Sequence, residues 1–82
     1  MPDGWADYQF WQENDRKLLR KLNALIKECS RAPFEGLGHP EPLSGDLSGF
    51  WSRRIDREHR LVYRVVEERL EIAQCRYHYE RG

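Results

Sequence analysis

Residues 50–77, FWSRRIDREHRLVYRVVEERLEIAQCRY, carry the pattern that decides the fold. They contain three segments rich in β-branched and aromatic residues, at 50–55, 59–66 and 70–77. Such residues favour strands, and the short charged segments that separate them are typical of turns. The stretch therefore predicts an antiparallel meander of three strands.

Two helical segments precede the meander. Asp3 can cap a short helix in which aromatic residues recur at helical spacing. Asn14-Asp15 interrupts this helix and offers a cap for a second one, over residues 16–30, with one apolar stripe: Leu18, Leu22, Leu25, Ile26 and Cys29. The order predicts an α+β fold, a two-helix hairpin packed on a small antiparallel β-sheet. At 82 residues we expect a single domain, 1–82.

The segment 31–46 connects the helices to the meander and is rich in proline and glycine. This composition excludes a helix and a central strand, and a long loop in a compact domain is usually functional. Within it, Glu41 stands between Pro40 and Pro42, which restrict the backbone around it. A rigidly presented carboxylate suits a general base. A surface glutamate between two turn prolines is the alternative, and the tripeptide alone does not decide.

Composition excludes several classes of protein. Fourteen basic and fourteen acidic residues cancel, so the chain is not a polyelectrolyte tail. No apolar run approaches the roughly 18–20 residues of a membrane span, and no basic, apolar leader opens the sequence. Cys29 and Cys75 are too few for a disulfide framework and predict buried thiols in a reducing compartment, the cytoplasm. The three histidines lack metal-ligand spacing, so we expect no metal or other cofactor.

Arginine is the only basic residue type after position 30, and five arginines gather in and beside the second predicted strand: Arg53, Arg54, Arg57, Arg60 and Arg64. Arginine provides the planar fork that recognises phosphate. Strand alternation puts Arg60 and Arg64 on one face, and Leu61 and Tyr63 on the other. A solvated, ion-paired strand face and a local RNA-binding surface both fit this pattern, and both remain open.

Tyr77-His78-Tyr79 ends the last predicted strand. Histidine is well matched to proton transfer near neutral pH, and tyrosines such as Tyr77 can stack on unpaired bases. An aromatic strand end packed on the helices is the alternative. A carboxylate, arginines and a histidine together match the needs of metal-free RNA cleavage, but spacing alone does not show that they converge.

Short segments spread over residues 5–79 are similar to those of a known family, in the same order: WADY and WQ (5–8, 11–12), RAPFEG (31–36), GHPEPL (38–43), LSGFWSRRI (47–55), EHRLVY (58–63) and CRYHY (75–79). Through them the chain resembles the YoeB branch of the RelE toxin superfamily, the ribosome-dependent mRNA interferases of bacterial toxin–antitoxin operons. The resemblance implies the RelE-like microbial RNase fold. It also implies a metal-independent endoribonuclease that cuts mRNA in the ribosomal A site by 2′-hydroxyl attack, leaving a cyclic phosphate.

The resemblance also assigns roles to residues. Glu41 resembles the family's general base, His78 its general acid, and Arg60 the residue that stabilises the transition state. Tyr79 resembles the tyrosine that orients the mRNA. Arg53 and Arg54 match basic positions near the phosphate and rRNA path.

Partners follow from the same resemblance. They are a YefM-type antitoxin whose C-terminal tail covers the site, the ribosome with its mRNA, and a second toxin copy in a homodimer. Operator DNA would be bound only through the antitoxin, and no membrane is involved. A non-catalytic toxin-like binder that acts as an operon co-repressor, and a generic RNA-binding module, are the alternatives.

Three features depart from the family's pattern. The short apolar strand that opens family members is missing before Trp5, which predicts a sheet without its first strand. Glu80-Arg81-Gly82 follow Tyr79, where the family tends to stop. Ser44 stands at a position that is often basic in relatives.

Overall fold

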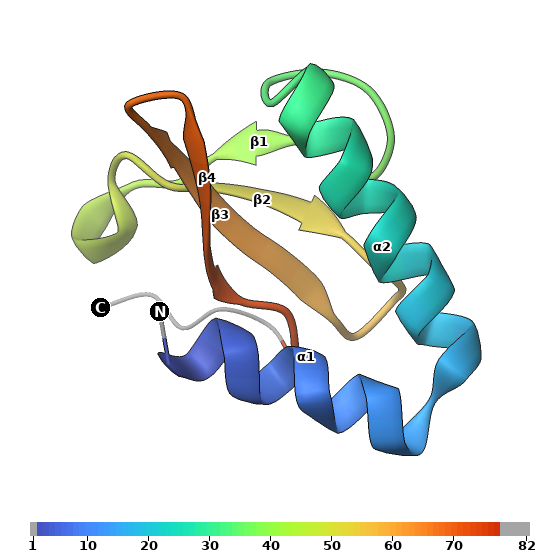
Figure 1. Cartoon of the computed structure of the whole chain (residues 1–82). Helices are drawn as coiled ribbons and strands as arrows, with labels where there is room; N and C mark the ends of the chain where they lie inside the picture. Colours follow the sequence, from blue (N-terminus) through green and yellow to red (C-terminus); the bar gives the residue numbers. More distant parts are fainter. Residues whose placement is uncertain (1, 78–82) are drawn as a thin grey trace.

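The computed structural model describes residues 2–77. Two helices pack against a four-stranded antiparallel sheet, as Figure 1 shows. The elements in chain order are α1 (Pro2–Asn14), α2 (Arg16–Arg31), β1 (Glu41–Pro42), the 3-10 helix η1 (Gly45–Leu47), β2 (Trp51–Arg54), β3 (Arg60–Val66) and β4 (Arg69–Gln74). The predicted α+β fold with its helical hairpin is confirmed.

Helix α2 forms as its sequence predicts. The Asp15 carboxylate accepts the Leu18 N–H at 3.0 Å, which satisfies one of the donors left open at a helix start. The predicted stripe is buried at four of its five positions, and the fifth, Ile26, is partly buried against the same core. Pro33 follows the helix end and prevents its continuation.

Helix α1 is held against β4 and the segment after it. The buried Trp11 donates its indole N–H to the Cys75 carbonyl at 2.8 Å, and the Asp7 carboxylate accepts the Cys75 N–H at 3.1 Å. Gly4 permits the close approach, because an added Cβ would lie 2.3 Å from the Ile72 carbonyl oxygen. The approach therefore requires glycine at this position.

Both cysteine thiols are free and buried, as predicted. Burial, with a smaller effect of the Asp7 carboxylate, raises the pKa of Cys75 to about 12. Burial also raises the pKa of Cys29. Both sulfurs therefore behave as apolar core atoms at neutral pH.

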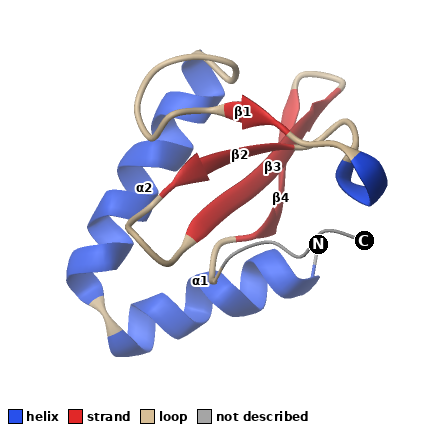
Figure 2. Cartoon of the chain, turned by 180° about the vertical axis from the view of Figure 1, so that it is seen from behind, coloured by secondary structure: helices blue, strands red, loops and turns tan. Residues whose placement is uncertain are grey.

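The described part of the chain holds one strand more than the sequence predicted. The sheet order is β1-β2-β3-β4, and β1 lies within the proline-rich segment that was expected to be a loop. Figure 2 shows β1 at the edge of the sheet, beside β2. An edge strand pairs on one side only, so it tolerates a proline that lacks an N–H donor. The exclusion of a central strand there was right, and the expectation of a loop throughout was wrong.

The core lies between the helices and one face of the sheet. It joins the α2 stripe and Trp11 to Ile55, Leu61, Tyr63 and Cys75. Leu61 and Tyr63 therefore face the helices, as strand alternation predicted. We call this side of the sheet the inner face, and the opposite side the outer face.

Candidate active site

The pairing register assigns three predicted site residues to the outer face. Glu41 pairs with Ser52, and Ser52 pairs with Val62, so these three side chains form a row on one face. Arg54 lies two residues beyond Ser52 and pairs with Arg60, two residues before Val62. Side chains two residues apart in a strand share a face. Because Leu61 lies on the inner face, Glu41, Arg54 and Arg60 share the outer one.

Strand geometry sets how far apart these residues lie. Glu41 and Arg60 are separated by two strand spacings of about 4.8 Å and by two residues of about 3.4 Å along the strand, so their Cα atoms are roughly 12 Å apart. Ser52 and Val62 between them are buried, while Glu41 at the sheet edge is exposed. The Glu41 carboxylate and the Arg60 guanidinium thus extend from two different strands of this face, with β2 between them.

Arg60 is half-buried at the start of β3. Its Nη1 donates to the main-chain oxygens of Asp56, at 2.8 Å, and His59, at 3.1 Å. Both bonds use the same nitrogen and fix one end of the guanidinium at the β2–β3 turn. The side chain is thereby oriented before any anion arrives, which is what electrostatic stabilisation of a developing charge requires.

The β2–β3 turn is itself held by the Asp56 side chain. One carboxylate oxygen accepts the N–H of Glu58 at 2.8 Å and the N–H of His59 at 2.7 Å. Burial alone would raise the pKa of Asp56, but these two backbone bonds, with smaller electrostatic effects of His59 and Lys21, outweigh it and lower the pKa. The turn therefore stays closed while Asp56 is ionised.

His59 connects this turn to the last described residue. Its Nδ1 accepts the Tyr77 N–H at 2.7 Å, and the Arg60 N–H donates to the Tyr77 carbonyl at 3.0 Å. An imidazole that accepts at Nδ1 carries its proton at Nε2, and Glu58 Oε1 lies 3.7 Å from that nitrogen. The chain just before His78 is therefore anchored beside Arg60. In the sequence, only the adjacency of His59 to Arg60 pointed to a role for this histidine.

A basic cleft of about 690 Å³ lies at this end of the sheet. Its lining includes four cationic residues, Lys21, Arg54, Arg57 and Arg60, and one carboxylate, Asp56. Four cations against one carboxylate give the cleft a net positive charge. Such a surface attracts anions such as phosphate groups. Lys21 comes from α2 and was not among the predicted site residues.

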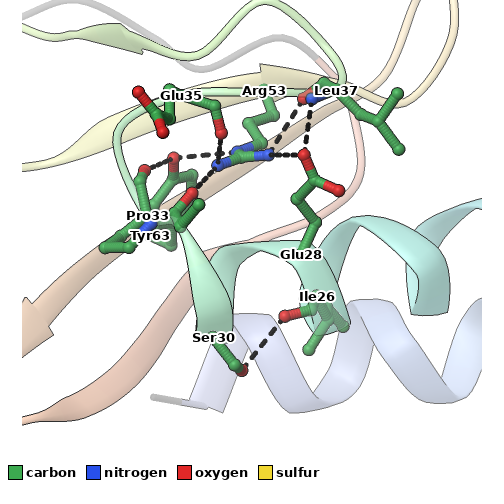
Figure 3. Close-up of polar contacts among 9 residues, drawn as sticks. Ile26, Glu28, Ser30, Pro33, Glu35, Leu37, Arg53 and Tyr63 are labelled. Atoms are coloured by element: carbon green, nitrogen blue, oxygen red, sulfur yellow. Dashed lines mark hydrogen bonds and ion pairs between the residues drawn. The ribbon is translucent and has the colours of Figure 1, made fainter.

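The prediction for Arg53 is corrected by its position. Arg53 is 0% exposed and lies on the inner face, where Figure 3 shows its guanidinium bonded to groups of the protein itself. Phosphate cannot reach it there. The neighbouring Arg54 is exposed and lines the basic cleft.

The predicted C-terminal site residues lie partly outside the described chain. His78 and Tyr79 are not among residues 2–77. Tyr77 is 51% exposed, and its hydroxyl accepts from Arg76 Nη2 at 2.9 Å. Within residues 2–77, three or more His, Cys, Asp or Glu side chains do not gather as a metal site would require, and neither helix is long and apolar enough to cross a membrane.

The fold and this site define a class: a small α+β domain with a basic cleft and an exposed carboxylate on the same sheet. Residues 1–79 match the family described as the YoeB-like toxin of bacterial type II toxin-antitoxin systems. The chain belongs to this family, and is thus a toxin of a toxin–antitoxin system.

Individual relatives agree with this assignment. The chain is 60% identical over 77 residues to toxin YoeB of Escherichia coli K12, covering 94% of this chain and 92% of the relative. The solved structure of a YoeB/ParE toxin from Agrobacterium tumefaciens superposes with a TM-score of 0.93 at 54% identity, covering 96% of this chain and 94% of that one.

Staphylococcus aureus YoeB has been solved in two assemblies. Its complex with YefM matches with a TM-score of 0.90 at 45% identity, and its dimer with a TM-score of 0.88 at 46% identity. Each match covers 96% of this chain and 92% of the other.

Proposed function

We propose that this toxin is a ribosome-dependent endoribonuclease that cuts mRNA in the ribosomal A site and so stops translation. The reaction needs a base for the ribose 2′-hydroxyl, a cation at phosphorus and an acid for the leaving 5′-oxygen. Family membership and the chemistry of the outer face support this proposal.

Each residue has one role in the proposed reaction. Glu41 takes the proton of the 2′-hydroxyl, whose oxygen attacks the adjacent phosphorus. Arg60 stabilises the additional negative charge of the transition state, and His78 gives a proton to the departing 5′-oxygen. The products are a 2′,3′-cyclic phosphate and a free 5′-hydroxyl. Tyr79 and Tyr77 orient the nucleotide, and Arg54 binds the neighbouring phosphate.

The observation that carries the proposal is the shared face of Glu41, Arg54 and Arg60. Acid and base must reach opposite sides of one phosphodiester, so they should come from different parts of the fold. Glu41 stands on the edge strand, whereas the chain before His78 is anchored beside Arg60. A phosphate between them would meet the Arg60 guanidinium.

The ribosome has a defined part in this mechanism. A carboxylate is a weak base toward a hydroxyl proton, so most of the rate gain must come from orientation of the mRNA and exclusion of water. We therefore expect cleavage on ribosomes and almost none on the same mRNA free in solution. Comparable rates in the two conditions would contradict this mechanism.

The partners follow from the relatives. The Staphylococcus aureus complex supports a YefM-type antitoxin that binds and neutralises this toxin, and the dimer of the same protein supports a homodimer. We propose that the toxin meets operator DNA only through that antitoxin, and that it acts in the cytoplasm, where ribosomes are.

A cell-free translation assay tests the proposal. Wild-type toxin should yield truncated mRNA, and Glu41→Gln, which keeps the shape but removes the base, should lower the rate by about 10²–10⁴-fold. Glu35→Gln is the matched control, because Glu35 is an exposed glutamate of the preceding loop, and it should cut like wild type.

Two results would select the alternatives. Full-length mRNA after incubation with wild-type toxin and ribosomes indicates a non-catalytic antitoxin binder that serves as co-repressor. Tight binding to naked RNA that weakens steeply with salt, and no need for ribosomes, indicates a generic RNA-binding module.

A further inference from the structure

The buried Arg53 holds the loop that leads to the proposed base. We use the name Arg53 clamp for Arg53, Glu28 and Tyr63, shown in Figure 3. The Arg53 guanidinium donates from Nη1 to the Leu37 carbonyl at 3.0 Å, and from Nη2 to the carbonyls of Glu35, at 2.8 Å, and Ala32. One side chain thus fixes three carbonyls of the segment 32–37.

The other two members complete the clamp. Arg53 Nε donates to the Tyr63 hydroxyl at 3.1 Å, and this hydroxyl donates to the Pro33 carbonyl. Glu28 Oε1 accepts the Leu37 N–H at 3.0 Å and lies 3.8 Å from Arg53 Nη1. The guanidinium is buried with a counter-ion and hydrogen-bonded at each nitrogen, which is how a buried charge becomes tolerable.

Glycine fits the clamp where the loop passes Glu28. Gly36 has a φ of 109°, and an added Cβ would lie 1.8 Å from Glu28 Oε1. Any side chain there would displace the carboxylate that binds both Leu37 and Arg53. Glycine at position 36 is therefore required by the nearby Glu28 carboxylate as well as by the local backbone conformation.

Apolar burial alone does not fix this loop. Its two large apolar side chains, Phe34 and Leu37, are 54% and 58% exposed. Phe34 contacts the Trp51 ring at a centroid distance of 4.7 Å. The polar bonds of the clamp therefore provide most of the loop's restraint.

The restraint extends to the edge strand. Immediately after the clamped segment, the Gly38 carbonyl accepts the Arg54 N–H at 2.7 Å, and β1 begins three residues later at Glu41. Beyond β1, the Leu43 N–H donates to the Phe50 carbonyl at 2.9 Å. β1 has only two residues, so the restraints on either side must set its register with β2.

We infer that Arg53 is a positioning residue: by clamping loop 32–37 from the inner face, it sets the position of Glu41 on the outer face. The inference rests on the proposed function for its catalytic consequence. Its structural consequence, that the clamp fixes the position of β1, does not depend on the proposed function. The resemblance placed Arg53 near the RNA. In the structure Arg53 is buried and does not reach that surface, so its effect on Glu41 is exerted through the loop.

Two variants of the clamp test the inference. Arg53→Lys keeps the positive charge but loses the planar guanidinium that donates hydrogen bonds from three nitrogens. Tyr63→Phe keeps the guanidinium and removes only the hydroxyl, so it remains informative if Arg53→Lys does not fold. Tyr8→Phe is the matched control, because it also removes a single tyrosine hydroxyl, which donates to Asn23 Oδ1 at 2.9 Å between α1 and α2, away from the loop.

The first measurement is amide hydrogen exchange, which needs no ribosome. We expect the Leu37 and Leu43 amides to exchange at least about tenfold faster in both clamp variants than in wild type or Tyr8→Phe. An unchanged Leu43 amide in a folded clamp variant would overturn the inference, whatever the fate of the cleavage reaction. A toxin that cuts nothing on ribosomes refutes the proposed function, and the exchange result then decides the inference alone.

The second measurement separates positioning from RNA contact and from general stability. Single-turnover cleavage on programmed ribosomes should be roughly 10–100-fold slower in the clamp variants, because small displacements of a catalytic group cost rate. The toxin concentration giving half-maximal rate should not change. A higher half-maximal concentration at an unchanged maximal rate would overturn the inference. So would a wild-type cleavage rate despite faster exchange of the Leu43 amide, or an equal loss of rate in Tyr8→Phe.

Discussion

Arg53 and Arg54 are adjacent in β2 and have opposite surroundings. Arg53 lies on the inner face, fully buried among carbonyl groups, whereas Arg54 is exposed and lines the basic cleft. The same chemical group is structural at one position and available to an anion at the next. The difference comes from strand alternation, together with the helix that covers one face.

The comparison extends to the whole sheet. The inner face carries the core and the Arg53 clamp, while the outer face carries Glu41, Arg54 and Arg60. Substitutions on the inner face should therefore act first on stability, and those of Glu41, Arg54 and Arg60 on activity. Four experiments test this separation and the contacts that hold the fold together, from the largest expected effect to the smallest.

Arg53→Ala should have the largest effect. It removes the buried guanidinium and leaves the Glu28 carboxylate and three loop carbonyls without their partner. The expected loss is about 3–5 kcal/mol of unfolding free energy, measured by urea denaturation. Arg54→Ala should change stability by less than about 0.5 kcal/mol, as exposed positions do. Similar losses at both positions would remove the distinction between the faces.

Arg60→Ala should reverse this pattern. We expect the cleavage rate on ribosomes to fall by about 10²–10³-fold, because a preoriented cation at phosphorus is lost. The unfolding free energy should change by only about 1 kcal/mol for the lost bonds to two carbonyls. Arg69→Ala, at an exposed position of the β3–β4 hairpin, is the control and should cut normally. An active but unstable Arg60→Ala protein would contradict the proposed role.

Trp11→Phe tests the attachment of α1. It leaves the Cys75 carbonyl without the indole donor at 2.8 Å, which should cost about 1–3 kcal/mol in a thermal or urea unfolding experiment. Trp5→Phe is the matched control on the same helix, because Trp5 is largely exposed, and it should be near neutral. Equal effects of the two substitutions would show that the hydrogen bond to Cys75 does not stabilise the fold.

Asp56→Asn should have the smallest effect, and one that depends on pH. The folded protein lowers the pKa of Asp56, so the ionised carboxylate contributes stability above its ordinary value of 3.8 and loses it as pH falls through the folded value. Because this group is partly solvated, we expect the wild type to exceed Asp56→Asn by less than about 1 kcal/mol at pH 7. The difference should shrink toward pH 3 in paired urea titrations. A difference that grows on acidification would contradict the lowered pKa.

The parts of the fold that could be predicted depend on local pattern. The α2 stripe recurs at helical spacing after the Asp15 cap, and β3 is rich in β-branched and aromatic residues, so both followed from the sequence. β1 did not, because a two-residue strand flanked by proline has no periodicity and forms only through pairing with β2. For the candidate site, the roles of Glu41, Arg54, Arg60, His78 and Tyr79 all stay predictions, and the structure adds that the first three share one face of the sheet.

The sequence by itself determined the α+β class and the family and supplied the candidate residues of the site, because these depend on composition, short-range periodicity and motif order. Only the tertiary structure decided which arginine is buried, which face carries the carboxylate, and that His59 holds the chain before His78. Those decisions depend on contacts between residues far apart in the chain. The Arg53 side chain, for example, meets carbonyls 16–21 residues away, and no local pattern encodes that meeting.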